Sequence, residues 1–316
     1  MTEFIGFIGD IKFHPPIMNA SGVLCTTEED LQAVLESRAG ACVTKTMTLE
    51  PREGNPKPRC FWTQDFSVNS MGIPNKGVEY YVEAARRLKK YQKPMIASMA
   101  GLQKEEYFLL SEKLEKSDFH AIEVNLSCPN LEGKEIFAYD FQLAKEVLYQ
   151  LRKRISKPMG VKLPPYSSRY HIQEIAKILL EVSVDFVSLS NSFPLGTAIL
   201  SEKEETAILP NGGIGGLGGK AFRPIVLGQI LLFQRHFKGQ IPIIGVGGIE
   251  KGVHLYEHLL AGASLFQIGT ALLREGPFLF QKILEEANHI FQQKGLSSYR
   301  DKCGKVKAPS PKDQKE

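Results

Sequence analysis

The sequence predicts an α/β fold, a (β/α)8 TIM barrel with a short N-terminal β-hairpin and inserted loops at its C-terminal face. Three observations predict it. Eight short apolar runs have the length and composition of buried parallel strands. Amphipathic segments with helical periodicity separate them, and polar or glycine residues follow nearly every run. A doubly wound open sheet is the structural alternative, since strand number is difficult to fix from one sequence.

The predicted strands follow a short hairpin in chain order. Residues Phe4 to Phe13 are short and alternating enough for a hairpin, which in barrels often closes the bottom. The eight runs after it are Ile17 to Gly22, Ala41 to Thr48, Met95 to Gly101, Ala121 to Ser127, Met159 to Pro164, Val184 to Ser190, Pro242 to Gly247 and Ala263 to Thr270.

The helices are predicted between these runs, where apolar residues recur at helical spacing. They include Glu28 to Glu36, Val78 to Tyr91, Glu105 to Leu114, Phe141 to Ile155, Ile172 to Val182 and Pro277 to Gln293. Two connections are much longer than one βα unit and carry insertions, at Glu50 to Lys76 and Phe193 to Lys220. Long loops in a compact fold are often lids or ligand clamps.

Length and composition limit the protein class. The 316 residues allow two domains, but eight βα units need nearly all of them, so we predict one domain over 1–304 and a flexible tail over 305–316. A net charge of +4 is too dilute for nucleic-acid binding. No apolar segment is long enough for a membrane span, and the N-terminus lacks a signal sequence, so we expect a cytoplasmic protein. The five cysteines are scattered without a CxxC pair, which argues against disulfides and zinc.

Glycines at the strand ends indicate a phosphate site. Gly218-Gly219, Gly247-Gly248 and Gly269-Thr270 provide three loops whose backbone N–H groups can approach an anion. Gly213-x-Gly215-x-x-Gly218 matches a dinucleotide-binding pattern but follows Leu209-Pro210-Asn211 and not a strand. One phosphate site without a dinucleotide motif favours FMN.

Several polar residues at the strand ends are candidates for chemistry. Lys45 and Lys162 would enter the same barrel mouth, where a cation stabilises negative charge on a reduced flavin, although either could instead pair with a carboxylate. Cys128 follows a strand and could act as base, nucleophile or packing residue. His254 and His258 have metal-ligand spacing, but without a third ligand we predict solvated helix residues and no metal site.

Longer motifs show a resemblance to a known family. The sequence resembles the dihydroorotate dehydrogenases, specifically the soluble class 1A enzymes, over about residues 4–307. Class 1B enzymes differ in the loop that corresponds to Asn69–Asn75 and need an iron–sulfur partner, and class 2 enzymes carry a membrane-associating extension and a serine base. The matching stretches are MNASGVLCTTEEDL (18–31), VTKTMTLEPREGNPKPR (43–59), NSMGIPN (69–75), EVNLSCPN (123–130), GVKLPPY (160–166), GGLGGK (215–220), GVGGI (245–249) and QIGTAL (267–272).

The resemblance implies an enzyme of pyrimidine (UMP) biosynthesis that uses FMN to oxidise (S)-dihydroorotate to orotate. Fumarate would be the electron acceptor and be reduced to succinate, and the enzyme would be a homodimer without an iron–sulfur partner subunit. Cys128 would be the general base, with hydride transfer to flavin N5. The implied substrate-binding residues are Lys45, Asn69, Met71, Gly72, Ile73, Asn125, Asn130, Asn191 and Ser192. The implied FMN-binding residues are Ala20, Ser21, Lys45, Thr46, Asn69, Asn125, Lys162, Gly218, Gly219, Gly247, Gly248, Gly269 and Thr270.

The sequence also departs from the family pattern around the expected substrate. Phe193-Pro194-Leu195-Gly196 replaces the usual Ile-Gly-Asn-Gly, Leu209-Pro210-Asn211 replaces Lys-Pro-Lys, and Ser167-Ser168-Arg169 replaces a Phe-Asp pair. An FMN oxidoreductase acting on another dihydropyrimidine or enoate, or using another acceptor, is therefore the alternative. A non-catalytic barrel would have lost the base or the flavin lysines, and none is lost. A dihydrouridine synthase is disfavoured because no basic RNA-binding domain follows the barrel.

Overall fold

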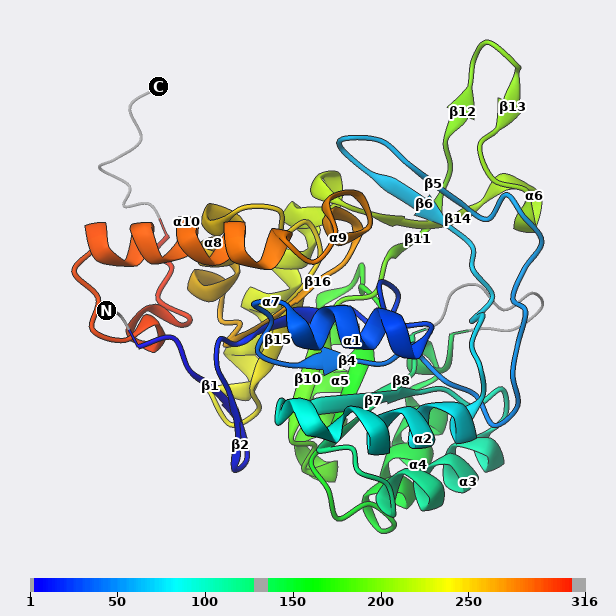
Figure 1. The fold of residues 1–316 in the computed structure, drawn as a ribbon, viewed down its shortest axis with the longest axis horizontal. Coiled ribbons are helices and arrows are strands. Elements are labelled where there is room, and N and C mark those ends of the chain that lie inside the picture. Colours follow the sequence, from blue (N-terminus) through cyan, green and yellow to red (C-terminus); the bar gives the residue numbers. More distant parts are fainter. Residues whose placement is uncertain (1–2, 128–135, 309–316) are drawn as a thin grey trace.

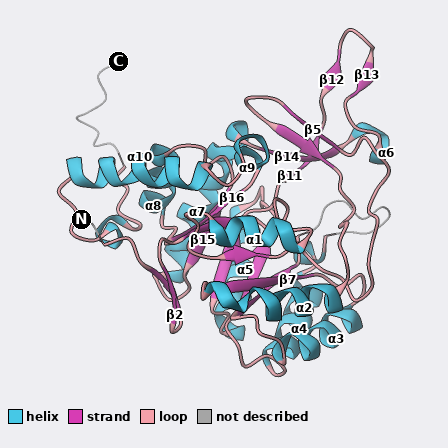
Figure 2. Cartoon of the chain, in the orientation of Figure 1, coloured by secondary structure: helices cyan, strands magenta, loops and turns pink. Residues whose placement is uncertain are grey.

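The computed structural model describes residues 3–127 and 136–308, and its centre is a ring of parallel strands surrounded by helices (Figures 1 and 2). The strand order is β3-β16-β15-β10-β9-β8-β7-β4, and every neighbouring pair is parallel. Chain order therefore runs round the ring, which confirms the predicted barrel over the doubly wound sheet. The strands are β3 (Ile17–Asn19), β4 (Cys42–Val43), β7 (Met95–Met99), β8 (Ala121–Asn125), β9 (Met159–Leu163), β10 (Phe186–Leu189), β15 (Ile243–Val246) and β16 (Leu265–Ile268).

The ring closes between β3 and β4 with little regular pairing. The backbone N–H of Gly40 donates to the carbonyl of Ile17 at 2.9 Å. The side chain of Asn19 also bridges the two strands, donating to the carbonyl of Val43 at 2.8 Å and accepting from its N–H at 2.9 Å. Where the ring closes between β3 and β4, the side-chain amide of Asn19 thus makes the hydrogen bonds that a backbone peptide group makes between paired strands.

Helices cover the outside of the ring, and each segment that the sequence predicts to be helical forms a helix in the structure. Local capping explains several starts: Thr27 and Asp30 form a capping box at α1, and Asp140 and Ser168 cap α4 and α5. The helices are α1 (Glu28–Glu36), α2 (Val78–Leu88), α3 (Lys104–Glu115), α4 (Phe141–Arg152), α5 (Arg169–Val182), α6 (Pro210–Gly213), α7 (Arg223–Phe237), α8 (Gly252–Ala261), α9 (Thr270–Glu275) and α10 (Leu279–Gln293), with 3-10 turns η1 (Lys89–Tyr91), η2 (Phe137–Tyr139), η3 (Lys220–Phe222) and η4 (Tyr299–Lys302).

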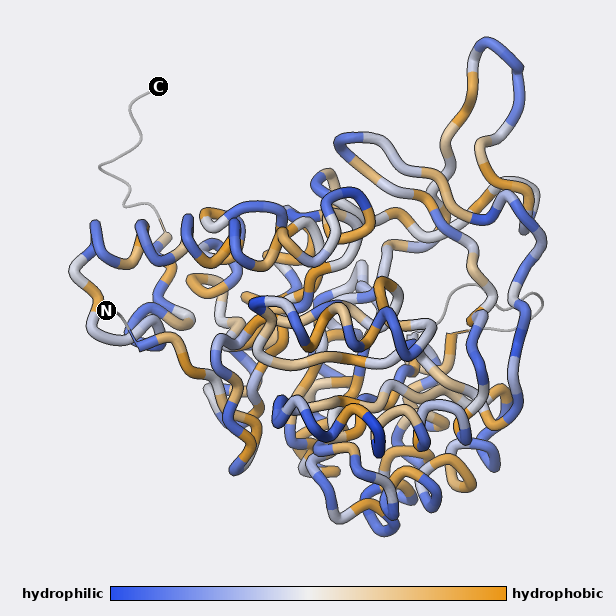
Figure 3. Tube along the Cα trace, viewed as in Figure 1, coloured by the Kyte–Doolittle hydropathy of each residue, from blue (hydrophilic) through white to orange (hydrophobic). Residues whose placement is uncertain are grey.

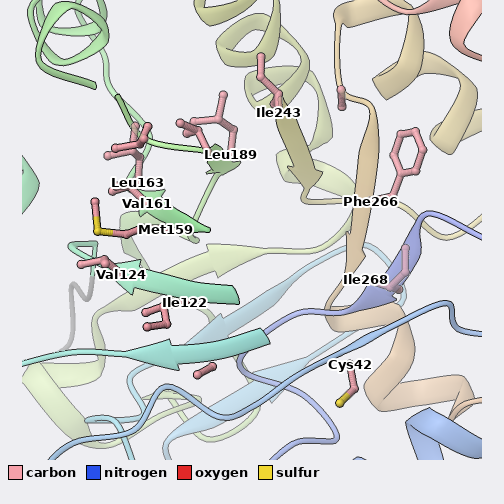
Figure 4. Close-up of a cluster of buried hydrophobic side chains, with 14 of the residues drawn as sticks. Cys42, Ile122, Val124, Met159, Val161, Leu163, Leu189, Ile243, Phe266 and Ile268 are labelled. Carbon is pink, nitrogen blue, oxygen red and sulfur yellow. The ribbon is translucent and has the colours of Figure 1, made fainter. Parts of the chain in front are cut away.

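The hydrophobic core has an outer and an inner part. Alternate residues of each strand, such as Val124 and Val161, point outward and pack under the helices (Figure 4). The inner part fills the bottom of the ring with residues such as Phe186 and Ile244. In Figure 3 the barrel strands are largely hydrophobic, whereas the tip of the hairpin formed by β12 (Ile199–Leu200) and β13 (Glu205–Thr206) is hydrophilic.

The predicted N-terminal hairpin is present as β1 (Gly6–Ile8) and β2 (Ile11–Phe13). Its side chains Ile8 and Phe13 are fully buried among the inner core residues. The hairpin therefore closes the bottom of the barrel and leaves the other end open for a ligand.

The two insertions come together in space, although they are far apart in sequence. β5 (Cys60–Trp62) and β6 (Ser67–Asn69) belong to the first, and β11 (Phe193–Gly196) and β14 (Gly215–Gly218) to the second. They form one antiparallel sheet of order β11-β14-β6-β5, beside the hairpin β12 (Ile199–Leu200) and β13 (Glu205–Thr206) (Figure 1). Gly215–Gly218 is thus an antiparallel strand, which excludes the dinucleotide-binding interpretation of the glycine string.

The end of the chain is partly described. Within 305–308 of the predicted tail, the Val306 N–H donates to the Leu260 carbonyl at 3.2 Å. No helix in the described part of the chain has the length and apolar character needed to cross a membrane.

Candidate active site

A cavity of about 400 Å³ opens at the carboxyl ends of the barrel strands, beneath the sheet that the insertions form. All the predicted cofactor-binding residues line it. So do most of the predicted substrate-binding residues, namely Lys45, Asn69, Met71, Ile73, Asn125, Asn191 and Ser192. Gly72 lies in the same loop but does not line the cavity, and Cys128 and Asn130 lie outside the described residues.

A hydrogen-bonded network joins the ends of four strands, β3, β4, β8 and β9, at the bottom of the cavity. Lys162 donates from Nζ to Ser21 Oγ at 3.1 Å, and Asn125 donates from Nδ2 to Thr46 Oγ1 at 3.1 Å. Thr46 Oγ1 in turn lies 3.5 Å from Ser21 Oγ. These bonds fix the side chains in a buried site and leave few alternative rotamers.

Ser127 extends this network to the next strand. Its hydroxyl and N–H both donate to Asn125 Oδ1, at 2.8 and 3.0 Å. Asn191 donates from Nδ2 to the Ser127 carbonyl at 3.0 Å, and its Oδ1 accepts from the Ser192 N–H at 2.9 Å. Two amide groups at the cavity are therefore oriented by a serine that the sequence did not identify as functional.

Two buried lysines reach the cavity, as predicted. Lys45 and Lys162 are 6% and 5% exposed. Among the described residues, neither ammonium group has a carboxylate oxygen within 4.0 Å, so the predicted alternative of a direct ion pair is not found there. Burial lowers the pKa of Lys162, and the negative charge of Glu123 opposes this effect. Two cations close together in a cavity favour a ligand with negative charge or strong acceptor atoms.

The glycine loops form a cradle at one side of the cavity. Gly219 and Gly248 have φ angles of 86° and 71°, which favour glycine. A Cβ on Gly248 would lie 2.6 Å from the Cβ of Arg223, so no side chain fits. A Cβ on Gly269 would have only Ala20 within 4 Å, and both residues line the cavity. The backbone N–H groups that precede η3 and α9 are thus accessible to an anion such as a phosphate.

Residues 69–73, which are predicted to contact the substrate, are held by an earlier part of the same insertion. Asn55 donates from Nδ2 to the carbonyl and hydroxyl of Ser70, both at 3.1 Å, and its N–H donates to the carbonyl of Met71 at 2.9 Å. A Cβ on Gly72, which has a φ of 70°, would lie 2.2 Å from Asn55 Oδ1. Asn211 donates to Ser70 Oγ at 3.1 Å, so the second insertion also supports the loop.

Some residues that line the cavity were not predicted. Ser67 Oγ lies 2.9 Å from Thr270 Oγ1 and connects the insertion sheet to the cradle. Most of the others are sequence neighbours of predicted residues, and this proximity is the one signal that could have indicated them. The additional lining residues are Gly22, Val23, Cys60, Trp62, Ser67, Ser190, Phe222, Val246, Ile249, Glu250, Ala271 and Leu273.

The prediction that His254 and His258 are solvated is wrong. Both are buried, because α8 packs between α7 and α10. His258 Nδ1 lies 2.8 Å from the His254 carbonyl. Burial lowers the pKa of each histidine to about 4, so both rings are neutral at pH 7. Across residues 3–127 and 136–308, no cluster of His, Cys, Asp and Glu could hold a metal ion.

The comparisons with known proteins agree with this geometry. The family model described as dihydroorotate dehydrogenase matches residues 6–291. The chain belongs to the dihydroorotate dehydrogenase family. It is 44% identical over 301 residues to dihydroorotate dehydrogenase A (fumarate) of Lactococcus lactis subsp. cremoris, which covers 94% of this chain and 97% of the relative. It is also 44% identical over 298 residues to dihydroorotate dehydrogenase (fumarate) of Saccharomyces mikatae, covering 93% and 95%. These relatives confirm the predicted class 1A resemblance.

The fold matches a solved structure of the family as well. The crystal structure of a dihydroorotate dehydrogenase from Eimeria tenella, in complex with ferulenol, has a TM-score of 0.81 at 19% identity and covers 96% of this chain and 88% of its own. Dihydroorotate dehydrogenases are flavin-dependent, and the cavity fits such a group: the glycine cradle leaves room for a phosphate, and in the described structure no carboxylate oxygen lies within 4.0 Å of either buried lysine ammonium group.

Proposed function

We propose that this chain oxidises (S)-dihydroorotate to orotate in pyrimidine biosynthesis, with FMN as cofactor and fumarate as acceptor, in the cytoplasm. One observation carries the proposal. A single cavity joins a glycine cradle, two buried lysines and a set of oriented amide side chains. Membership of the dihydroorotate dehydrogenase family indicates which reaction such a cavity would catalyse.

The cofactor would lie along the cavity from the cradle to the lysines. Gly218, Gly219, Gly247, Gly248, Gly269 and Thr270 would bind its phosphate, and Ala20, Ser21, Lys45, Thr46, Asn69, Asn125 and Lys162 would surround its ring system. FMN supplies the two-electron acceptor that oxidation of a carbon–carbon single bond requires. Lys162 and Lys45 would stabilise the negative charge that reduction brings to the ring.

The substrate would be held by amide groups and one cation. Orotate and dihydroorotate are anionic rings with paired donors and acceptors, which Asn side chains match. Ser127 holds Asn125 and Asn191 by hydrogen bonds, so little side-chain entropy would be lost when they bind a substrate. The proposed set is completed by Lys45, Asn69, Met71, Gly72, Ile73, Asn130 and Ser192.

Cys128 is the proposed general base. It would take the proton from C5 of dihydroorotate while the hydride on C6 leaves for the flavin, so that a C5–C6 double bond forms. In the second half-reaction, fumarate would receive the hydride and one proton and become succinate. Cys128 lies three positions after Asn125, the last residue of β8, in the part of the chain outside the described residues.

A second candidate is an FMN oxidoreductase for another dihydropyrimidine or enoate. It is favoured by the departures from the family pattern, two of which adjoin the cavity. The ring of Phe193 contacts that of Phe222, a lining residue, with centroids 6.2 Å apart. Asn211 contacts the loop 69–73 through Ser70.

An anaerobic titration tests the proposal. The purified protein should be yellow and release FMN on denaturation. Addition of (S)-dihydroorotate should bleach the flavin, and fumarate should restore the colour. A flavin that is not reduced by dihydroorotate but is reduced by another dihydropyrimidine would select the second candidate, and a protein unable to bind FMN would exclude both.

The resemblance also supports a homodimer, and sedimentation equilibrium of the purified chain tests this oligomeric state. It further implies that the enzyme needs no iron–sulfur partner. Activity with fumarate in the absence of any added subunit is expected. Dependence on a second protein would contradict this part of the proposal.

A further inference from the structure

A buried carboxylate lies inside the barrel directly below the proposed active site. Glu123 is fully buried on β8, two residues before Asn125, so both side chains point to the barrel interior. In the register of the sheet, Asn125 lies beside Lys162 of β9. The carboxylate therefore occupies the layer beneath this lysine.

Neutral hydrogen-bond donors hold this carboxylate. Its Oε2 accepts from Ser188 Oγ at 2.7 Å and from Gln267 Nε2 at 2.9 Å. Two donors on one oxygen suit an ionised carboxylate. Ser188 lies on β10 and is paired in register with Lys162 on the neighbouring strand β9. The lysine and the carboxylate are therefore both neighbours of the same serine. The other oxygen, Oε1, has no hydrogen-bond partner among the described residues.

A buried negative charge needs a nearby positive charge. Besides Glu123, the charged or titratable groups that act on Lys162 are Cys25 and Lys45. Burial lowers the pKa of Lys162 most, Lys45 lowers it further, and Glu123 is the strongest group that raises it. None of the proposed functions of Lys162 explains why a carboxylate should be buried there.

We infer that Glu123 is a positioning residue for the flavin chemistry: its buried carboxylate keeps the Lys162 ammonium charged and directed into the cavity. Glu123 acts through Lys162 and touches neither substrate nor cofactor. The inference deepens the proposed function and rests on it, because it assigns Lys162 to the bound flavin.

The test is the pH dependence of the flavin midpoint potential in the flavin-loaded protein and in Glu123→Gln. The flavin is reduced chemically with mediator dyes, so no substrate is needed. Loss of the carboxylate should shift the pH at which Lys162 loses its proton downward by about one unit or more, the usual effect of one close charge. Above that pH the potential of the variant should fall below that of the native protein, since the reduced ring loses a cation.

Two variants make the result specific. Ser188→Ala removes one hydrogen bond from Glu123 but keeps its charge, and its potential should follow the native curve. In a Lys162→Met background, Glu123→Gln should shift nothing further. A potential that is higher than native at every pH would show that Glu123 acts directly on the flavin, and superimposed native and variant curves would show that it does not act at all. Either result overturns the inference.

Unfolding measurements cover the remaining outcomes. If the protein binds no flavin, urea unfolding of the single and double variants decides instead. If Glu123→Gln alone does not fold, the test is whether the added Lys162→Met change restores folding, and a double variant that stays unfolded overturns the inference. The double variant Glu123→Gln/Lys162→Met should be more stable than the sum of the single losses predicts, because it leaves no unpaired buried charge. Strictly additive losses overturn the inference. A protein that binds flavin but is not reduced by dihydroorotate contradicts only the proposed substrate.

Discussion

The side chain of Asn19 hydrogen-bonds to both the N–H and the carbonyl of Val43, at 2.9 and 2.8 Å, and so joins the first strand of the barrel to the second. Asn19 Nδ2 also donates to the carbonyl of Val23 at 3.0 Å. The next residues, Ala20 and Ser21, line the cavity. The seam of the barrel and the floor of the site are therefore fixed by the same segment.

Asn19→Ala is expected to destabilise the protein by about 2 to 6 kcal/mol. The change leaves the N–H and carbonyl of Val43 buried without these partners, and each unsatisfied buried group costs about 1–3 kcal/mol. Urea unfolding measures the loss. Because Ala20 and Ser21 follow directly, flavin content should fall as well.

Asn288→Ala is the matched control. Asn288 is exposed on α10, and alanine has a higher helix propensity than asparagine, so stability should be unchanged or slightly higher. Equal stability of the Asn19 and Asn288 variants would contradict a role for Asn19 in closing the barrel.

Gly248→Ala should abolish flavin retention. Its φ of 71° disfavours alanine, and the new Cβ would lie 2.6 Å from Arg223 Cβ and 3.0 Å from the Gly219 carbonyl, inside the cradle. The flavin-to-protein absorbance ratio of the purified variant measures this. Gly228→Ala on α7 is the control: its Cβ meets nothing within 4 Å, so the flavin should remain and stability should rise by up to about 1 kcal/mol. Full flavin content in both variants would exclude the cradle as the phosphate site.

Cys128→Ala should retain flavin but slow its reduction by dihydroorotate on the order of 10² or more, as expected for loss of a general base. Stopped-flow absorbance of the flavin measures the rate. Cys303→Ala serves as the control, because that thiol contacts the Gly262 carbonyl at 3.4 Å and does not line the cavity. An unchanged rate in the Cys128 variant would mean that another group takes the proton.

The barrel and the cavity could be predicted from the sequence because both depend on local patterns. A buried parallel strand is a short apolar run, and its carboxyl end is marked by a polar or glycine residue, as at Lys162 and Gly247. Since all strand ends of a barrel meet at one face, these residues had to converge. The cavity that they line confirms this part of the prediction.

The contacts between distant segments could not be predicted. β6 and β14 pair Val68 with Leu217, and no local pattern in either insertion specifies that partner. Ser127 and Glu123 gain their functions from residues on other strands, so their own sequence neighbourhood carries no signal. His258 is buried because α10 packs against α8. The residue pattern of α8 predicts solvent-exposed histidines, and nothing in that segment indicates that another helix covers it.

His258 should make the protein sensitive to mild acid. Its pKa is lowered to about 4 by burial, whereas an unfolded histidine titrates near 6.5. The unfolded state therefore takes up a proton first, and the stability that the neutral ring contributes is present above about pH 6.5 and is lost as the pH falls toward 4, a change on the order of 3 kcal/mol. The free energy of unfolding of His258→Gln should decrease less between pH 7 and pH 4 than that of the native protein. His289→Gln, at an exposed position of α10, should follow the native curve. Parallel pH profiles for the native protein and His258→Gln would show that the buried ring contributes nothing to acid sensitivity.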